Sequence, residues 1–232
     1  MMMPLARKRP EKINRSEKRA RRTRQKLVNA AREVFAERGI DLATIDEITG
    51  RADVGKGTFY YYFSDKNEVV AELISDVLRN LDELMEKRCA DSHNLHDLMD
   101  QLIGAHIEFF STRWEDFVLY YQGRADLKLK ENYEGIEKPF LTYLESIERL
   151  IASMLQVGVS KAALRRVGCA VAGFLSGYYS FAVIASEDAD IDQTFRDLRT
   201  ALVSALTRFV NEALEQKTDQ SRQPRLFEDR SV

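Results

Sequence analysis

The sequence predicts an all-α fold of about nine helices, and three observations carry that prediction. The 232 residues include only 11 glycines and 4 prolines, alternating patterns typical of β-strands are nearly absent, and Ala, Leu, Glu and Arg are abundant. An apolar fraction of 44% is enough to form a core. Cys89 and Cys169 lack the spacing of a disulfide or metal site, which indicates a reducing cytoplasm. The basic N-terminus has no apolar stretch of the kind found in secretory signals.

The net charge of −2 conceals a division along the chain. Residues 1–26 carry eleven basic and two acidic residues, giving +9, whereas the other 206 residues carry 24 basic and 35 acidic residues, giving −11. We therefore expect residues 1–15 to form a basic, disordered arm that is attracted to polyanions. Such an arm is either a solubilising tail or a segment that follows DNA phosphates or enters the minor groove.

The first predicted helix starts near residue 16 or 20. It ends at Gly39, which can adopt the left-handed conformation of a C′ residue. Its core-facing residues recur at helical spacing, so this helix should support the segment that follows. They are Leu27, Ala31, Val34 and Phe35.

Residues 44–63, TIDEITGRADVGKGTFYYYF, predict two short helices joined by a tight turn. Thr44 and Glu47 form a capping box ahead of the first helix. Asp53 tolerates left-handed backbone and Gly55 can cap the second helix. That helix presents small, basic and hydroxyl-bearing side chains outward, and its inward residues are Val54, Phe59 and Phe63. Two helices in this arrangement fit the major groove of DNA.

Residues 52–66, ADVGKGTFYYYFSDK, resemble the helix-turn-helix of the tetracycline-repressor (TetR) family, whose pattern is close to A-G-V-S-K-G-T-L-Y-x-H-F-x-x-K. Asp53, Gly55 and Tyr62 depart from the pattern, so we expect an altered sequence preference rather than lost DNA binding. The resemblance implies a DNA-binding domain at 16–66 and a helical domain for effector binding and dimerisation at 67–215. A polar tail at 216–232 follows.

The same resemblance implies which side chains meet DNA. The residues expected to hold phosphates are Thr44, Tyr60, Tyr62 and Lys66. Those expected to face base edges or the adjoining backbone are Lys56, Gly57, Thr58 and Tyr61.

Beyond the motif, Ser64 is the expected N-cap of a helix that runs from about Asp65 to Lys87. Further helices are expected near 95–110 and 113–121. A longer helical region ends near residue 157, and Gly135 and Pro139 should bend or interrupt its early part. The last two helices are expected at 161–185 and 193–214.

Residues 167–186 contain no charged side chain. They predict either a membrane span or a helix buried between neighbours, and the glycines, serines and tyrosines within them weaken the first alternative. In the TetR family the last two helices pair with their copies in a second subunit, which implies a homodimer. The matching stripe on the final helix is Phe195, Leu198, Leu202, Ala205, Leu206 and Phe209.

Aromatic residues gather in the middle of the chain. Singly, each is expected to be ordinary core. Because members of the family bind an effector between these helices, the resemblance implies a pocket for a small apolar or amphipathic molecule. Its expected walls are Phe110, Trp114, Phe117, Tyr121, Tyr143, Phe174 and Tyr178.

The sequence predicts neither an enzyme nor a metal or cofactor site. His93, His96 and His106 are expected to be solvated, and no phosphate loop, nucleophile elbow or acid/base pair is recognisable. The favoured function is a cytoplasmic, homodimeric transcriptional regulator, a repressor that a small effector releases from a pseudo-palindromic operator. The alternatives are a DNA-associated structural protein of the same fold without an effector, and a membrane-associated or lipid-carrying protein.

Overall fold

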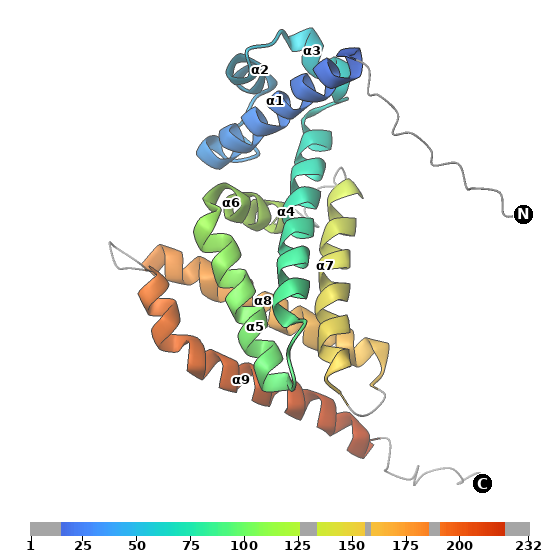
Figure 1. Ribbon diagram of the computed structural model, residues 1–232, viewed down its shortest axis with the longest axis vertical. Helices are drawn as coiled ribbons and strands as arrows, with labels where there is room; N and C mark the ends of the chain where they lie inside the picture. Colours follow the sequence, from blue (N-terminus) through green and yellow to red (C-terminus); the bar gives the residue numbers. More distant parts are fainter. Residues whose placement is uncertain (1–14, 126–133, 156–158, 186–190, 221–232) are drawn as a thin grey trace, which may run out of the picture. The chain divides into compact units, whose positions relative to one another are not determined.

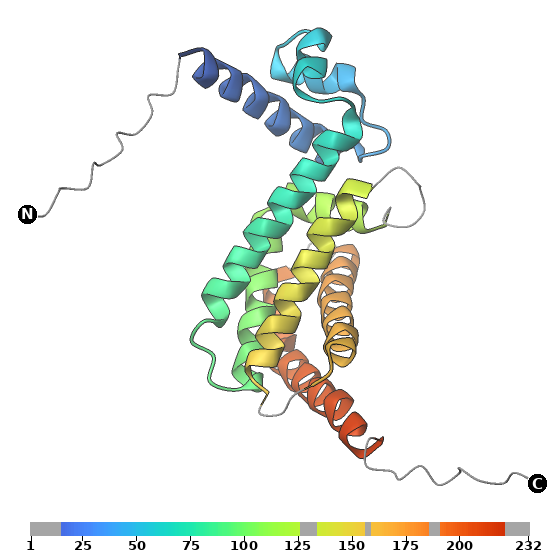
Figure 2. The same ribbon diagram turned by 90° about the vertical axis from the view of Figure 1, so that its right-hand side faces the viewer.

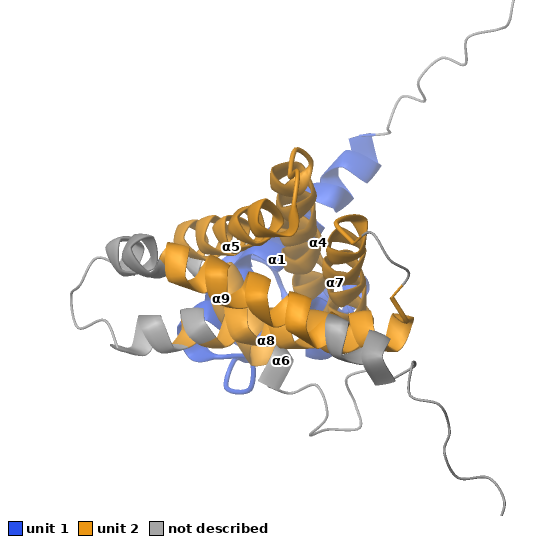
Figure 3. Cartoon of the chain, turned by 90° about the horizontal axis from the view of Figure 1, so that it is seen from below, with its two compact units in different colours: residues 1–69 blue, residues 70–232 orange. Residues whose placement is uncertain are grey.

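The computed structural model describes residues 15–125, 134–155, 159–185 and 191–220, and every regular element in these ranges is an α-helix (Figure 1). The prediction of an all-α fold is therefore confirmed. The chain divides into two compact units, residues 1–69 and residues 70–232 (Figure 3). The predicted basic arm, apart from Arg15, and residues 221–232 of the predicted tail lie outside the described residues.

The first unit contains α1 (Arg15–Arg38), α2 (Ile45–Ala52), α3 (Lys56–Tyr62) and the first residues of α4 (Lys66–Cys89). Its core forms because α1 supplies an apolar face to the two short helices. Phe35 on α1, Ile48 on α2 and Phe59 on α3 are all fully buried. The helix-turn-helix is thus held on a small hydrophobic core of its own.

Local backbone signals in this unit match the sequence. Gly39, with φ 81°, ends α1, and its N–H donates to the Phe35 carbonyl at 2.9 Å. Thr44 and Glu47 form the predicted capping box, and Asp53 is left-handed with φ 54°. Gly55 precedes α3 with extended backbone (φ −74°, ψ 150°).

The expected N-cap of α4 was wrong by one residue. The Glu68 N–H donates to the Asp65 carboxylate at 2.9 Å, so Asp65 is the cap. Ser64 acts as a donor instead, because its N–H and its hydroxyl both bond to Glu68 Oε2, at 2.7 and 2.9 Å. The start of the helix is consequently held by three hydrogen bonds, one to Asp65 and two from Ser64.

The second unit contains the rest of α4, then α5 (Leu95–Thr112), α6 (Trp114–Ala125), α7 (Glu134–Ser153), α8 (Lys161–Ala185) and α9 (Ile191–Gln220). The expected interruption at Pro139 is absent, since α7 continues through it. Pro139 is the sixth residue of α7, where its missing N–H leaves only one carbonyl without its usual donor.

Ion pairs and hydrogen bonds join the helices of this unit. Arg199 on α9 holds the Asp100 carboxylate on α5 through Nε and Nη2, at 2.7 and 2.8 Å. On α7, the buried Glu148 pairs with Arg165 of α8 at 2.5 Å. Because Arg–carboxylate pairs have a fixed planar geometry, these contacts define how the helices pack as well as adding stability.

The uncharged part of α8, which starts at Val167, is not buried on all sides. Val167, Val171 and Leu175 face the core, whereas Cys169 and Phe174 are exposed, Phe174 at 41%. Within a single chain, α8 is therefore buried on one side only. None of the helices in the described part of the chain is long and apolar enough to span a membrane.

Candidate DNA interface and effector site

The outer face of α3 is open, as its side-chain pattern predicts. Tyr60 is 52% exposed and Tyr61 is 77% exposed, while Phe59 is buried beneath them. The Tyr61 and Tyr62 rings meet edge to face, with centroids 4.9 Å apart. A Cβ added at Gly57 would meet nothing within 4 Å, so this position would let another molecule approach the backbone closely. The face offers hydroxyl groups and exposed backbone on one short helix.

The cations near this face are already paired. Lys56 Nζ lies 2.8 Å from Asp46 Oδ1, and this hydrogen bond raises the pKa of Lys56. Arg51 pairs with Glu37 at 2.5 Å, and Arg38 pairs with Glu47 at 2.6 Å. The sequence analysis missed these pairs because the partners are 9 to 14 residues apart, beyond the spacing of side chains that meet on a single helix. An approaching phosphate would have to compete with a carboxylate for each of these cations.

Lys66 is engaged within the first unit. Its ammonium group donates to the carbonyls of Ile40, Asp41 and Ala43, at 2.7, 3.1 and 3.0 Å. An ammonium group has three hydrogens, so these bonds use all of its donors. Thr44 is also occupied, since its hydroxyl bonds to Glu47 in the capping box. The geometry gives both residues a structural role, and a phosphate contact by Lys66 would require the loss of one of its bonds.

The start of α1 supplies exposed positive charge. The guanidinium of Arg24 lies over the Phe63 ring, 4.9 Å from its centroid, directly after the end of α3. The basic part of α1 therefore begins beside the end of α3 and extends along α1 toward its N-terminus. Its exposed cations are Arg15, Lys18, Arg19, Arg21 and Arg22.

Three of the expected effector-pocket residues pack together as core. Phe110, Phe117 and Tyr143 are all buried, and the Phe110 and Phe117 centroids are 5.4 Å apart. Tyr121 stacks on Phe117 at the edge of this cluster and is 49% exposed. Phe174 lies on α8 with its ring exposed. The side chains of Trp114 and Tyr178 lie outside the described residues.

His106 belongs to the same cluster, which contradicts the expectation that it is solvated. It is 3% exposed, and burial lowers its pKa to about 4. The Leu102 carbonyl, 2.8 Å from Nδ1, can only accept, so Nδ1 carries the proton. Nε2 therefore accepts from the Tyr143 hydroxyl at 2.7 Å. This bond links α5 to α7.

An open groove of about 420 Å³ lies between α4 and α7, which run side by side (Figure 2). It is lined by polar and apolar side chains from these two helices only. They are Ser75, Leu78, Arg79 and Asp82 on α4, and Lys138, Pro139, Thr142 and Tyr143 on α7. Of the predicted pocket residues whose side chains the structure describes, Tyr143 alone lines this groove. The sequence could have indicated that the four α4 residues lie together, because positions i, i+3, i+4 and i+7 share one helix face.

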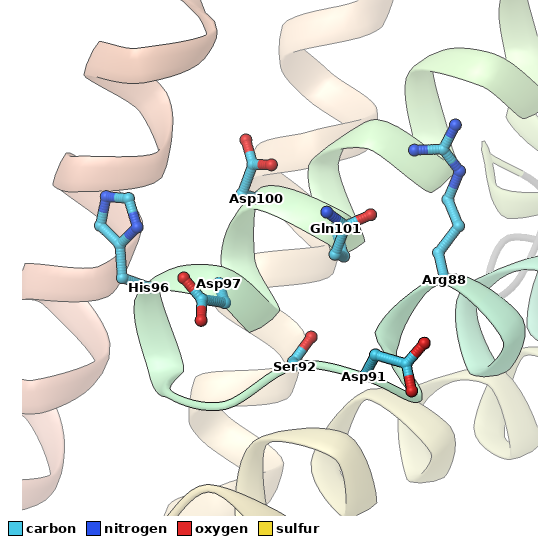
Figure 4. A pocket seen from close by; sticks show the side chains of 7 residues that line it. All are labelled: Arg88, Asp91, Ser92, His96, Asp97, Asp100 and Gln101. Atoms are coloured by element: carbon cyan, nitrogen blue, oxygen red, sulfur yellow. The ribbon is translucent and has the colours of Figure 1, made fainter.

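A second hollow, of about 440 Å³, lies around the loop between α4 and α5 (Figure 4). Asp100 is held by Arg199, the side-chain amide of Asn94 donates to Asp97, and Arg88 pairs with Glu108. In the described ranges, no group of three or more His, Cys, Asp or Glu side chains could hold a metal ion. The lining consists of Arg88, Asp91, Ser92, His96, Asp97, Asp100 and Gln101.

Comparison with known proteins places residues 27–73 within the family described as bacterial regulatory proteins, tetR family. The chain is 31% identical to the uncharacterized HTH-type transcriptional regulator YvdT of Bacillus subtilis (strain 168), over 53% of this chain and 63% of that protein. It thus spans less than two thirds of that relative. It is 27% identical to the HTH-type transcriptional repressor BepR of Brucella suis biovar 1 (strain 1330), over 66% of this chain and 72% of BepR.

Among solved structures, the chain resembles the transcriptional regulator FadR from Bacillus subtilis, determined in complex with stearoyl-CoA. The TM-score is 0.61 with 17% sequence identity, and the match covers 81% of this chain and 97% of FadR. At this level of identity the match shows a shared fold.

Proposed function

Because this chain belongs to the TetR family of bacterial regulatory proteins, we propose that it is a ligand-responsive transcriptional repressor that binds a pseudo-palindromic operator as a homodimer. The observation that carries the proposal is α3, a short helix capped by turn residues that exposes Tyr60 and Tyr61 over a buried Phe59. A helix presented in this way can enter the major groove, and two copies would read half-sites about 34 Å apart.

In this proposal the DNA-binding surface has two parts, the helix-turn-helix and the basic arm with the start of α1, and each makes a different kind of contact. Lys56, Gly57, Thr58 and Tyr61 would face base edges or the adjoining backbone, and Tyr60 and Tyr62 would hold phosphates, as would Thr44 and Lys66 if they give up internal bonds. The arm and the start of α1 would supply most of the salt-dependent attraction. The paired state of Lys56, Arg51 and Arg38 supports this division.

The exposed faces of α8 and α9 would form the dimer contact. Phe174 on α8 and Phe209 on α9 are each 41% exposed, and Ala205 lies one turn before Phe209. The side chains of Phe195 and Leu198 lie outside the described residues. Covering these aromatic rings would remove apolar surface from water. Light scattering that gives the mass of a single chain at micromolar concentration would contradict this contact.

The effector would bind in the second unit, where α4 provides a continuous helix from the end of the helix-turn-helix. A coupling of about 1–3 kcal/mol between effector and operator is typical of such regulators. BepR is named a repressor and FadR was determined with stearoyl-CoA, which supports a ligand-responsive repressor here.

The decisive experiment selects double-stranded DNA from a random pool with the full-length protein, and then measures affinity for the selected sequence. Tyr61→Ala should weaken binding to that sequence about tenfold or more, because the loss of one good base contact costs about 1–3 kcal/mol. Leu141→Ala removes an exposed side chain from the second unit and serves as the control. A pool without an enriched sequence, or equal effects of the two variants, would contradict the proposal.

A further inference from the structure

The groove between α4 and α7 has the size and composition of a small-molecule site. Its volume of about 420 Å³ falls within the range of ligand pockets, about 300–1,000 Å³. Leu78, Pro139 and the Tyr143 ring provide apolar surface, while Ser75 and Thr142 provide hydroxyl groups. A ligand lying here would contact α4 and α7 at the same time.

Asp82 gives the groove its chemical preference. Its Oδ1 atom is buried and has no hydrogen-bond partner among the described residues. The neighbouring acid on the same helix, Asp76, is instead satisfied by Arg79 at 2.5 Å. A buried carboxylate oxygen without a donor is costly, and such atoms are rare in folded proteins. Because Asp82 lines the groove, a rotation of its carboxylate would bring this oxygen to the groove, where it would accept a hydrogen from a bound molecule.

A charged donor satisfies a carboxylate more strongly than a neutral one. From Asp82 and the apolar wall together, the geometry points to a site for a small amphipathic amine, whose ammonium group bonds to Asp82 and whose hydrocarbon part lies on Leu78 and Pro139. Lys138 is exposed at the rim, where its flexible side chain can turn toward water. Arg79 is neutralised by Asp76, so it does not repel the ligand as a free cation would.

The position of the groove also indicates how the ligand would act. One helical turn beyond Asp82, Glu86 pairs with Arg149 of α7 at 2.6 Å, which joins the two helices at that end. A ligand in the groove would separate α4 from α7 beside this joined end. Because α4 begins at Lys66, directly after the helix-turn-helix, such a movement would reach the DNA-binding unit. This step rests on the proposed function, whereas the binding site itself does not.

Isothermal titration calorimetry of the full-length protein without DNA tests the site, with hexylamine as the probe and hexanoate as its anionic counterpart. We expect hexylamine to bind more tightly than hexanoate, and Asp82→Asn to weaken hexylamine binding at least about tenfold. Glu83→Gln removes the same charge from an exposed neighbouring position and should bind hexylamine like the wild type. Tighter binding of hexanoate, equal effects of the two variants, or no binding of hexylamine would overturn the inference.

The stability of the ligand-free protein provides a second measurement. If Asp82 is unpartnered, Asp82→Asn should leave the melting temperature unchanged or raise it, since a neutral amide is less costly to bury. A lower melting temperature would show that Asp82 has a structural partner, and would overturn the inference. Both measurements omit DNA, so a protein that binds an operator but not hexylamine would refute this site while the proposed function stands.

Discussion

Replacing Lys66 with Met separates a structural role from a phosphate contact. Met keeps an apolar stem but removes the ammonium group that bonds to the Ile40, Asp41 and Ala43 carbonyls. The Ile40 and Ala43 bonds are partly buried, whereas the Asp41 carbonyl is exposed and can turn to water. At about 1–2 kcal/mol for each partly buried carbonyl, the variant should lose about 2–4 kcal/mol of local stability.

Hydrogen–deuterium exchange of the full-length protein measures this loss where it occurs. The Ala43 N–H bonds to the Gly39 carbonyl at 3.2 Å, within the same turn. Since each 1.4 kcal/mol is a factor of ten, exchange of this amide should accelerate about 30- to 1,000-fold in Lys66→Met. Lys56→Met is the matched control, because Lys56 is exposed and its ion pair with Asp46 lies at the surface, where such pairs add little stability.

The salt dependence of DNA binding distinguishes the two roles independently. A lysine that neutralises one phosphate contributes about 0.9 to the slope of log K against log salt concentration. A structural Lys66 should leave that slope unchanged in the variant, although overall affinity falls. If the slope instead decreases by about 0.9 and amide exchange stays slow, the phosphate contact predicted from the sequence is correct and the structural role is refuted.

Three further changes test other parts of the molecule. Deleting residues 1–15 should flatten the log K against log salt slope by several units, at about 0.9 for each lost phosphate contact, and an unchanged slope rules out that role. His106, with its pKa lowered from 6.5 to about 4, binds a proton more readily in the unfolded chain; stability should therefore fall between pH 6.5 and 4, by up to about 3 kcal/mol. In His106→Gln, the denaturant midpoint of unfolding should not show this fall in stability between pH 6.5 and 4. Gly123→Ala would place a Cβ too close to Ile74 Cδ1 and cost about 1–3 kcal/mol, which Ile74→Val should partly relieve in the double mutant.

The features that the sequence predicted well depend on residues close together in the chain. The Thr44–Glu47 capping box, the left-handed Asp53 and the end of α1 at Gly39 each involve contacts within four residues. The error at the start of α4 shows the limit of such signals. Ser64 and Asp65 can both cap, and the choice depends on which of the two side chains accepts the hydrogen of the Glu68 N–H.

Contacts between distant residues could not be predicted in this way. Lys66 bonds to carbonyls 23 to 26 residues earlier, and His106 bonds to Tyr143, 37 residues later. Both side chains are polar and neither lies in a motif that identifies its partner. The sequence therefore suggested a solvated histidine, and the packing of the helices shows that His106 is buried. The phosphate contact that the family resemblance implies for Lys66 stays a prediction, although its ammonium group bonds to three carbonyls.

Because cations of the DNA-binding unit are paired with carboxylates, DNA affinity and sequence preference would come from different parts of the protein. Lys56 and Arg51 are each within 2.8 Å of a carboxylate, so a phosphate that recruits one of them must displace an existing partner. In the proposed function, little net attraction would then come from this part of the surface, and Tyr61 would carry most of the discrimination between bases. Neutralising the arm should accordingly weaken binding to all DNA sequences by a similar factor, whereas Tyr61→Ala should change their ranking.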